Sequence, residues 1–349
     1  MPDQSYYAQQ LHDLEAAGAR RIFPIVQSEQ GPHFIVDGKR YLNLCSNNYL
    51  GFAAHPRLKA AAIKAIEQYG VGTTSVRSLI GTNVLHLELE QALARFKKAE
   101  DAVVVTSGYL ANLAALQTLL TREDIVISDE LNHASIIDGV SLAKIQNKLI
   151  YPHNDVAALR AMIPQIRQLQ AKIRSDGKPP VAMIVTDGVF SMDGDVANIP
   201  ELLAVAEEID AMLVVDDAHG EGVLGQPESM GRGVVDHYGI HGHARIIEVG
   251  TLSKAFGVNG GFIAGNKGMV EFLRQKSRQF LFTNALSIPD TAALIESVKI
   301  LEESDELVKK LWENTKILKE GLKAARFDIG VSTSPITPVM VGEEAKARE

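Results

Sequence analysis

Cysteine is almost absent from the sequence. Cys45 is the single cysteine in 349 residues, so no disulfide can form within the chain. Disulfides are rare in reducing compartments, and we therefore expect a cytoplasmic location. No apolar run approaches the roughly 18 residues that cross a bilayer, and the first residues, "MPDQSYYAQQLHDLEAAG", are polar instead of basic and then apolar. We expect neither a membrane partner nor an export signal.

An excess of positive charge is also missing. The 35 lysines and arginines are outnumbered by 43 aspartates and glutamates, which gives a net charge of −8. Nucleic acids and anionic membranes bind basic surfaces, so neither is expected as the main partner. A small anionic ligand in a local pocket is compatible with this balance.

Two stretches imitate ligand-binding motifs incompletely. "GVGTTS" at 70–75 lacks the third glycine and the preceding strand of a dinucleotide-binding loop. "HYGIHGH" contains His237, His241 and His243, but a histidine-rich loop alone is more often solvated than a metal site. The sequence predicts no bound metal.

Apolar, strand-like runs alternate with helical patterns through the middle of the chain. The strand-like runs are "DAVVVTSG", "DIVISD", "KLIYPH", "VAMIVTDG", "AMLVVDDAHG" and "ARIIEVG". Strands buried on both faces and separated by helices imply an α/β fold with a mainly parallel sheet.

Near residue 286 the alternation of strand-like and helical patterns ends. Long amphipathic helices are predicted from there, followed by an extended segment, "STSPITPVMVG". We expect an N-terminal segment at 1–50, a large ligand-binding domain at 51–285, and the start of a smaller α+β domain at 286–349. The last part is short for an independent core, so the small domain is expected to be truncated.

Lys254 has an unusual setting. It lies in "EVGTLSKAFGVNGGFIAG", between the apolar run "ARIIEVG" and the apolar segment "GGFIAG". Both neighbours are predicted to be buried, so the lysine would lie where a strand ends inside the protein. A lysine there is either paired or takes part in chemistry.

Other polar residues also follow predicted strands, at the edge of an α/β sheet where ligands gather. They include the neighbours Asp216 and Asp217, then His219, Thr251, Ser191 and His133, and the helix start Ser107, Gly108 and Tyr109, which suits a phosphate. Each alone has an ordinary structural explanation as a cap, an ion pair or a core hydrogen bond. Together, a buried lysine, a carboxylate, a phosphate seat and a flat stacking partner indicate pyridoxal 5′-phosphate (PLP) held as a Schiff base.

The motifs around these residues resemble the α-oxoamine synthase family, in order and over nearly the whole chain. They are "SNNYLG" (46–51), "TSVRSLIGT" (74–82), "SGYLAN" (107–112), "SDELNHASIIDG" (128–139), "TDGVFSMDGD" (186–195), "VVDDAHGEGVLG" (214–225), "GTLSKAFG" (250–257) and "LFTNALSIP" (281–289). The resemblance implies a fold-type-I, PLP-dependent homodimer with shared active sites that condenses an amino acid with an acyl-CoA.

The resemblance also implies roles for single residues. Lys254 matches the Schiff-base lysine, which also moves the proton at the substrate α-carbon. Asp216 matches the carboxylate that keeps the pyridine nitrogen protonated, and His133 the imidazole that stacks on the ring and meets the substrate. The other implied contacts are Ser191 and His219 at the ring 3-oxygen, Gly108, Tyr109 and Thr251 at the phosphate, Thr283 reaching the phosphate from the second subunit, and Asn47 and Arg20 on the substrate side.

Within the family, "TDGVFSMDGD", "SVRSLIGT", "VVDDAH" and "KKLWENT" resemble glycine C-acetyltransferases, or broad-specificity bacterial relatives, more than a dedicated oxononanoate synthase. We therefore expect first a condensation of glycine with acetyl-CoA to a 2-amino-3-oxo acid and CoA. The alternative is 8-amino-7-oxononanoate synthesis from alanine and a pimeloyl thioester with loss of CO₂, a step of biotin synthesis. A non-catalytic partner subunit is a third possibility, against which the presence of Lys254 argues. The family's carboxylate-binding arginine falls after "PITPVMVG", beyond the motifs present, so we expect a truncated chain.

Overall fold

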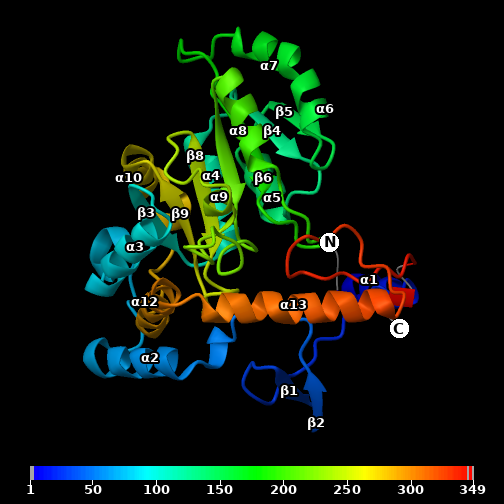
Figure 1. Ribbon diagram of the computed structural model, residues 1–349. Helices are drawn as coiled ribbons and strands as arrows, with labels where there is room; N and C mark the ends of the chain where they lie inside the picture. Colours follow the sequence, from blue (N-terminus) through cyan, green and yellow to red (C-terminus); the bar gives the residue numbers. More distant parts are fainter. Residues whose placement is uncertain (1–3, 344–345, 348–349) are drawn as a thin grey trace.

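A computed structural model describes residues 4–343 and 346–347 of the chain. Its centre is a sheet of seven strands: β3 (Asp101–Val105), β4 (Ile125–Asp129), β5 (Asn147–Tyr151), β6 (Ala182–Asp187), β7 (Ala211–Asp216), β8 (Ile246–Thr251) and β9 (Gly261–Gly265). They lie in the order β3-β9-β8-β7-β6-β4-β5 (Figure 1). Only β9 runs antiparallel to its two neighbours. The predicted α/β fold with a mainly parallel sheet is confirmed.

Successive residues of the central strands enter different apolar clusters. In β7, Leu213 and Val215 belong to one cluster and Val214 to another. Helices α4 (Gly108–Leu119), α5 (Ala134–Leu142) and α10 (Lys267–Lys276) contribute to the cluster of Val214, and α6 (Val156–Ala161), α7 (Ile163–Gln170) and α8 (Ile199–Glu208) to the other. Because both faces are covered, these strands are apolar throughout. At the sheet edge, alternate residues of β5 are exposed.

A third apolar cluster joins helices from both ends of the chain. It combines side chains of α2 (Pro56–Tyr69), α3 (Val84–Phe96), α12 (Ile288–Glu303) and α13 (Glu306–Ala324). Helix α12 follows the expected domain boundary at 286 and packs on α2 and α3, which precede it. The division into 1–50, 51–285 and 286–349 stays a prediction. The short helices are α9 (Val234–His237), α11 (Arg278–Leu281), the 3₁₀ turn Phe52–Ala54 and the π-helical turn Arg77–Gly81.

Two local features differ from the sequence-based expectation. The helical pattern over 155–173 forms two helices, because Pro164 in the first turn of α7 has no N–H for a continuous helix. An unforeseen hairpin joins β1 (His33–Val36) to β2 (Lys39–Leu42). Asp37 and Gly38 both have positive φ at its turn, the conformation that an Asp-Gly pair favours.

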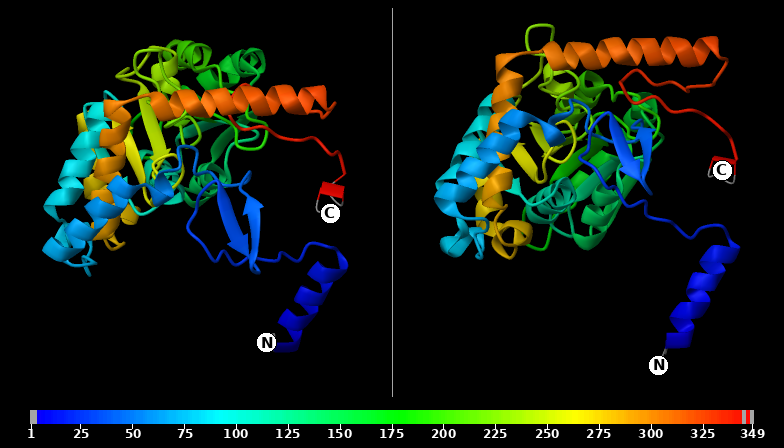
Figure 2. Two further views of the ribbon diagram at one scale, coloured as in Figure 1. Left: turned by 60° about the horizontal axis from the view of Figure 1, so that its bottom comes forward. Right: turned by 90° about the horizontal axis from the view of Figure 1, so that it is seen from below.

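The ends of the chain extend away from the sheet. Figure 2 shows α1 (Gln4–Ala16) set apart from the body, and none of its residues is buried. Near the other end, the backbone N–H groups of Thr333 and Ser334 donate to the carbonyl of Gly194. This contact ties the C-terminal segment to the loop that follows β6. Among the described residues, the helices are too short or too polar for a membrane span.

Candidate active site

Parallel strands bring the polar residues that follow them to one edge of the sheet. Asp187 at the end of β6 lies directly opposite Asp216 at the end of β7, and β8 ends beside them at Thr251. A cavity of about 230 Å³ opens at this edge. It brings together eight of the predicted residues: Ser107, Gly108, Tyr109, His133, Asp216, His219, Thr251 and Lys254.

Lys254 lies in the cavity within a chain of hydrogen bonds. Its Nζ is 2.8 Å from Nε2 of His219, whose Nδ1 is 2.7 Å from the hydroxyl of Tyr49. Burial lowers the pKa of the Lys254 amine against the opposing charges of Asp216 and Asp187. Burial, together with the Lys254 charge, lowers the pKa of His219 to about 3. Around neutral pH the histidine is therefore uncharged, and the lysine more readily becomes a neutral, nucleophilic amine.

Asp216 is held by groups that the sequence analysis did not identify. Asn112 Nδ2 donates to Asp216 Oδ2 at 2.6 Å and to the hydroxyl of Ser135 at 2.8 Å, while the backbone N–H of Ala218 donates to Asp216 Oδ1 at 3.0 Å. These donors fix the position of the carboxylate at the cavity wall. The spacing could have identified Asn112 as a site residue. It follows Gly108 by one turn of α4 and therefore lies on the same face of the helix.

The same network orients His133. Its Nδ1 is 2.7 Å from the Ser135 hydroxyl and accepts from the Ser135 backbone N–H at 3.2 Å. Because the Ser135 backbone N–H donates to Nδ1, that nitrogen carries no proton of its own, and the Ser135 hydroxyl donates to it as well. Nδ1 is thus an acceptor, and the ring proton lies on Nε2.

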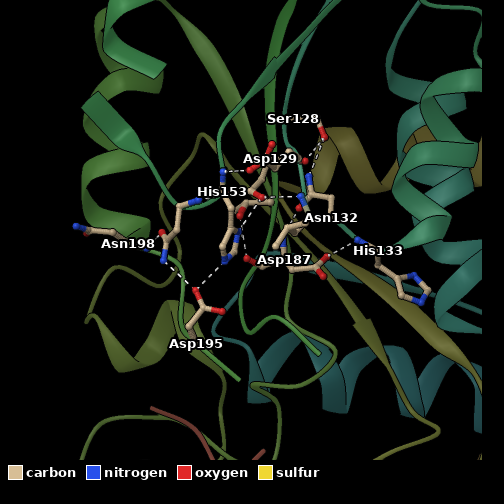
Figure 3. Close-up of polar contacts among 12 residues, drawn as sticks. Ser128, Asp129, Asn132, His133, His153, Asp187, Asp195 and Asn198 are labelled. Carbon is tan, nitrogen blue, oxygen red and sulfur yellow. Dashed lines mark hydrogen bonds and ion pairs between the residues drawn. The ribbon is translucent and has the colours of Figure 1, made fainter. Parts of the chain in front are cut away.

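Asp187 was also missed, although "VTDG" places it after β6 as "VVDD" places Asp216 after β7. The backbone N–H of His133 donates to Asp187 Oδ1 at 3.4 Å, and Asn132 accepts from the Asp187 N–H at 2.8 Å (Figure 3). Burial, and then the charge of Asp216, raises the pKa of Asp187 well above its usual range. Two ionised carboxylates at this edge are costly unless a cation lies between them.

Asp217 has a different role from its neighbour. Its carboxylate accepts from Lys97 Nζ at 2.9 Å and from the backbone N–H of Val234, in a region with no solvent exposure. Lys97 is also 2.8 Å from Glu248. Asp217 therefore belongs to a buried ion-pair cluster, and it does not line the cavity.

The start of α4 provides an anion seat. The Ser107 side chain caps the helix by accepting from the N–H of Leu110 at 3.2 Å. A Cβ on Gly108 would be 2.8 Å from Thr251 Cβ, so only glycine allows the helix start to lie this close to the Thr251 hydroxyl. The first backbone N–H groups of a helix lack intrahelical partners and can bind an anion. Tyr109 offers such an anion only its backbone N–H, because its hydroxyl donates to Asp138. This donor set, with Lys254 and Asp216 in the same cavity, fits PLP.

The remaining predicted residues lie elsewhere. Ser191 and Asn47 line a neighbouring pocket of about 440 Å³ that shares His219 with the first cavity. Arg20 and Thr283 line neither of these two pockets. Arg20 pairs with Glu15 at 3.1 Å, and the Thr283 hydroxyl donates to the carbonyl of Gln279.

Comparisons with known proteins agree with this geometry. The model of the aminotransferase class I and II family matches residues 39–349. The chain is 50% identical over 341 residues to the 8-amino-7-oxononanoate synthase of Thermosipho melanesiensis (98% of this chain, 83% of that protein) and 51% identical over 333 residues to that of Fervidobacterium nodosum (95% and 81%). Its fold is similar to that of a serine palmitoyltransferase variant from S. paucimobilis solved with a bound PLP–myriocin aldimine. The TM-score is 0.86, and the two are 32% identical over 98% of this chain and 86% of that one.

Proposed function

The chain belongs to the aminotransferase class I and II family and, within it, to the PLP-dependent α-oxoamine synthases, and on that premise we propose that it is an 8-amino-7-oxononanoate synthase. It would join alanine to a pimeloyl thioester, releasing CO₂ and the thiol. The supporting observation is that the chain shares 50% and 51% sequence identity with two synthases of this name, over 98% and 95% of its length. The glycine C-acetyltransferase activity that the motifs favoured has no such support, and the comparisons favour the alternative.

PLP is the cofactor of this family, and the cavity residues suit it. When bound, PLP withdraws the electrons left on the substrate α-carbon after a bond to that carbon breaks. Lys254 would hold the cofactor covalently, since burial favours its neutral amine. Once displaced by the substrate amine, Lys254 would accept and return the proton at the α-carbon, with the uncharged His219 2.8 Å away to orient it.

Asp216 would face the ring nitrogen. The Asp216 carboxylate, held in place by Asn112 at 2.6 Å, would pair with that nitrogen and keep it protonated. His133, with Nδ1 occupied by Ser135, would cover one face of the ring and present its Nε2–H toward the substrate.

The other predicted contacts complete the proposal. Gly108, Tyr109 and Thr251 would bind the phosphate at the start of α4, and Ser191 and His219 the ring 3-oxygen. Asn47 lines the neighbouring pocket, where the substrate would enter. Arg20 and Thr283 lie outside the two pockets of their own chain, and we assign Thr283 to the cavity of a second subunit.

A steady-state screen tests the substrate assignment. The purified chain is assayed for thiol release with alanine, glycine and serine, each against acetyl-CoA, a long acyl-CoA and pimeloyl-CoA. The proposal expects the highest kcat/KM for alanine with pimeloyl-CoA. A preference for glycine with acetyl-CoA would restore the first expectation, and absence of turnover with PLP bound would favour a non-catalytic subunit.

A further inference from the structure

His153 lies between two carboxylates from different parts of the fold. It follows β5, and its Nδ1 is 3.0 Å from Asp129 Oδ1 at the end of β4. Its Nε2 is 3.1 Å from Asp195 Oδ2 in the loop that follows β6. Figure 3 shows the ring between the two acids, and the ring of Phe190 packs edge-on against it at 4.3 Å between centroids.

Both ring nitrogens must donate in this arrangement. An ionised carboxylate only accepts hydrogen bonds, and a neutral imidazole has one N–H, so the two contacts together need the imidazolium. Two further acidic residues lie close to it, Asp193 in the same loop and Glu130, which accepts from the His153 backbone N–H. Burial alone would lower the pKa of His153, but the hydrogen bond and charge of Asp129 and the charge of Asp195 outweigh it and raise the pKa.

The Asp195 end of this bridge belongs to the loop that carries Ser191. Within loop 188–197, Val189 and Val196 form a β-bridge, and the N–H of Phe190 donates to the carbonyl of Asp195 at 3.0 Å. The carbonyl of Gly194 accepts from the C-terminal segment. A shift of Asp195 would therefore move Ser191 and the wall of the pocket that Ser191 lines.

The Asp129 end is fixed independently of His153. The Asp129 carboxylate accepts from the backbone N–H groups of Leu131 at 2.9 Å and Asn154 at 2.7 Å. Asp195 has a weaker second tie, a 3.2 Å bond from the Asn154 side chain. The Asn154 side chain also donates to the Val196 carbonyl at 3.2 Å, so loss of the imidazolium weakens the link between the loop and the end of β4 without freeing the loop altogether, and it leaves β4 in place.

We propose that His153 is a positioning residue, whose imidazolium ties loop 188–197 to the end of β4 and so sets the place of Ser191 beside His219. Proton loss leaves one ring nitrogen without hydrogen opposite a carboxylate, which loosens the loop. The loop's pH response does not depend on which substrates the enzyme uses. The consequence for the cofactor rests on the proposed function, because it assumes Ser191 at the ring 3-oxygen.

Hydrogen exchange by mass spectrometry on the full chain with PLP bound tests this proposal. We compare wild type, His153→Gln, His153→Arg and the control His243→Gln, which alters a surface histidine paired with Glu207. At about pH 6 the peptide covering 188–197 should exchange about tenfold faster in His153→Gln than in wild type, and at about pH 9 the two should agree. His153→Arg keeps a cation between the acids and should stay protected at both pH values, and the control should match wild type.

The absorption band of bound PLP supplies the second readout. At about pH 6 the position or intensity of this band should differ between His153→Gln and wild type, whereas His243→Gln should have the wild-type band. Unchanged loop exchange in His153→Gln, or acceleration that is equal over the whole chain, would overturn the proposal. A loosened loop with an unchanged absorption band would overturn the link to Ser191.

If His153→Gln does not fold, the wild-type protein alone tests the proposal. Its loop 188–197 must then lose exchange protection relative to β6 between about pH 6 and about pH 9. A wrong substrate assignment changes the thiol-release screen and leaves loop exchange unaffected.

Discussion

Adjacent residues at the end of β7 have opposite surroundings. Asp216 lines the cavity and accepts hydrogen bonds from Asn112 and Ala218, whereas Asp217 is fully buried against Lys97. The reversal of side-chain direction between consecutive residues of an extended chain explains the difference. One carboxylate is available to a ligand, and the other stabilises the junction of α3 with the sheet.

This contrast predicts different consequences for two matched substitutions. Asp216→Asn removes the charge proposed to face the ring nitrogen, so kcat/KM should fall about a hundredfold to a thousandfold. Asp217→Asn should leave kcat/KM within about threefold of wild type but lower stability by about 1–3 kcal/mol, because Lys97 loses a close partner. Kinetics at saturating PLP and thermal unfolding separate the two effects. Equal losses of kcat/KM would mean that the roles of the two carboxylates are misassigned.

At the scale of elements, the contact between α4 and β8 shapes the anion seat. Gly108 at the helix start and Thr251 at the strand end leave no room for a Cβ, which would come within 2.8 Å of Thr251. Helices usually gain from alanine in place of glycine, but here the close approach outweighs propensity. The close packing of α4 against β8 therefore requires glycine at position 108.

Gly108→Ala should therefore weaken PLP binding about tenfold or more, since the helix start must move away from Thr251. Gly321→Ala is the matched control, because a Cβ there meets nothing within 4 Å in the last turn of α13. The control should keep wild-type PLP affinity and raise stability by up to about 1 kcal/mol. PLP titration and thermal unfolding measure both. Undiminished affinity in Gly108→Ala would contradict the assignment of this seat.

The strands of the sheet were predictable because burial on both faces leaves uninterrupted apolar runs, as in "VAMIVTDG". The cavity residues at their ends followed from the same reasoning and from the family motifs. Asn112 and Ser135 were not predicted, because a polar residue on an apolar helix shows its partner only after the helix is placed against the sheet. His153 was missed for the same reason, since its two acids lie 24 and 42 residues away along the chain.

At the scale of the whole molecule, the surroundings of Thr283 favour an assembly. Val76 forms a β-bridge with Asn284, which brings the turn 77–81 beside Thr283. Leu79 and Ile80 on that turn are 76% and 87% exposed. Exposed apolar side chains gathered at one place are typical of an interface, so this region suits contact with a second copy of the chain.

A shared site predicts complementation between inactive variants. Lys254→Ala lacks the proposed cofactor lysine, and Thr283→Glu places a negative charge where the partner's phosphate would bind. Each alone should be inactive, but a mixed dimer has one site with both residues intact. After subunit exchange, an equal mixture should regain up to about a quarter of the wild-type activity. No recovery despite exchange proven by sedimentation would contradict the shared site and leave the role of Lys254 untouched.

If Lys254 carries the cofactor in this cavity, borohydride reduction followed by peptide mapping should locate the cofactor on this lysine. The holoenzyme is reduced, digested and searched by mass spectrometry for the pyridoxyl group. We expect the pyridoxyl group on Lys254, whose pKa is lowered by burial, and loss of the visible absorption band of the cofactor on reduction. We expect none on Lys97, which is buried in ion pairs that raise its pKa. A pyridoxyl group on any lysine other than Lys254 would show that Lys254 is not the residue that binds the cofactor.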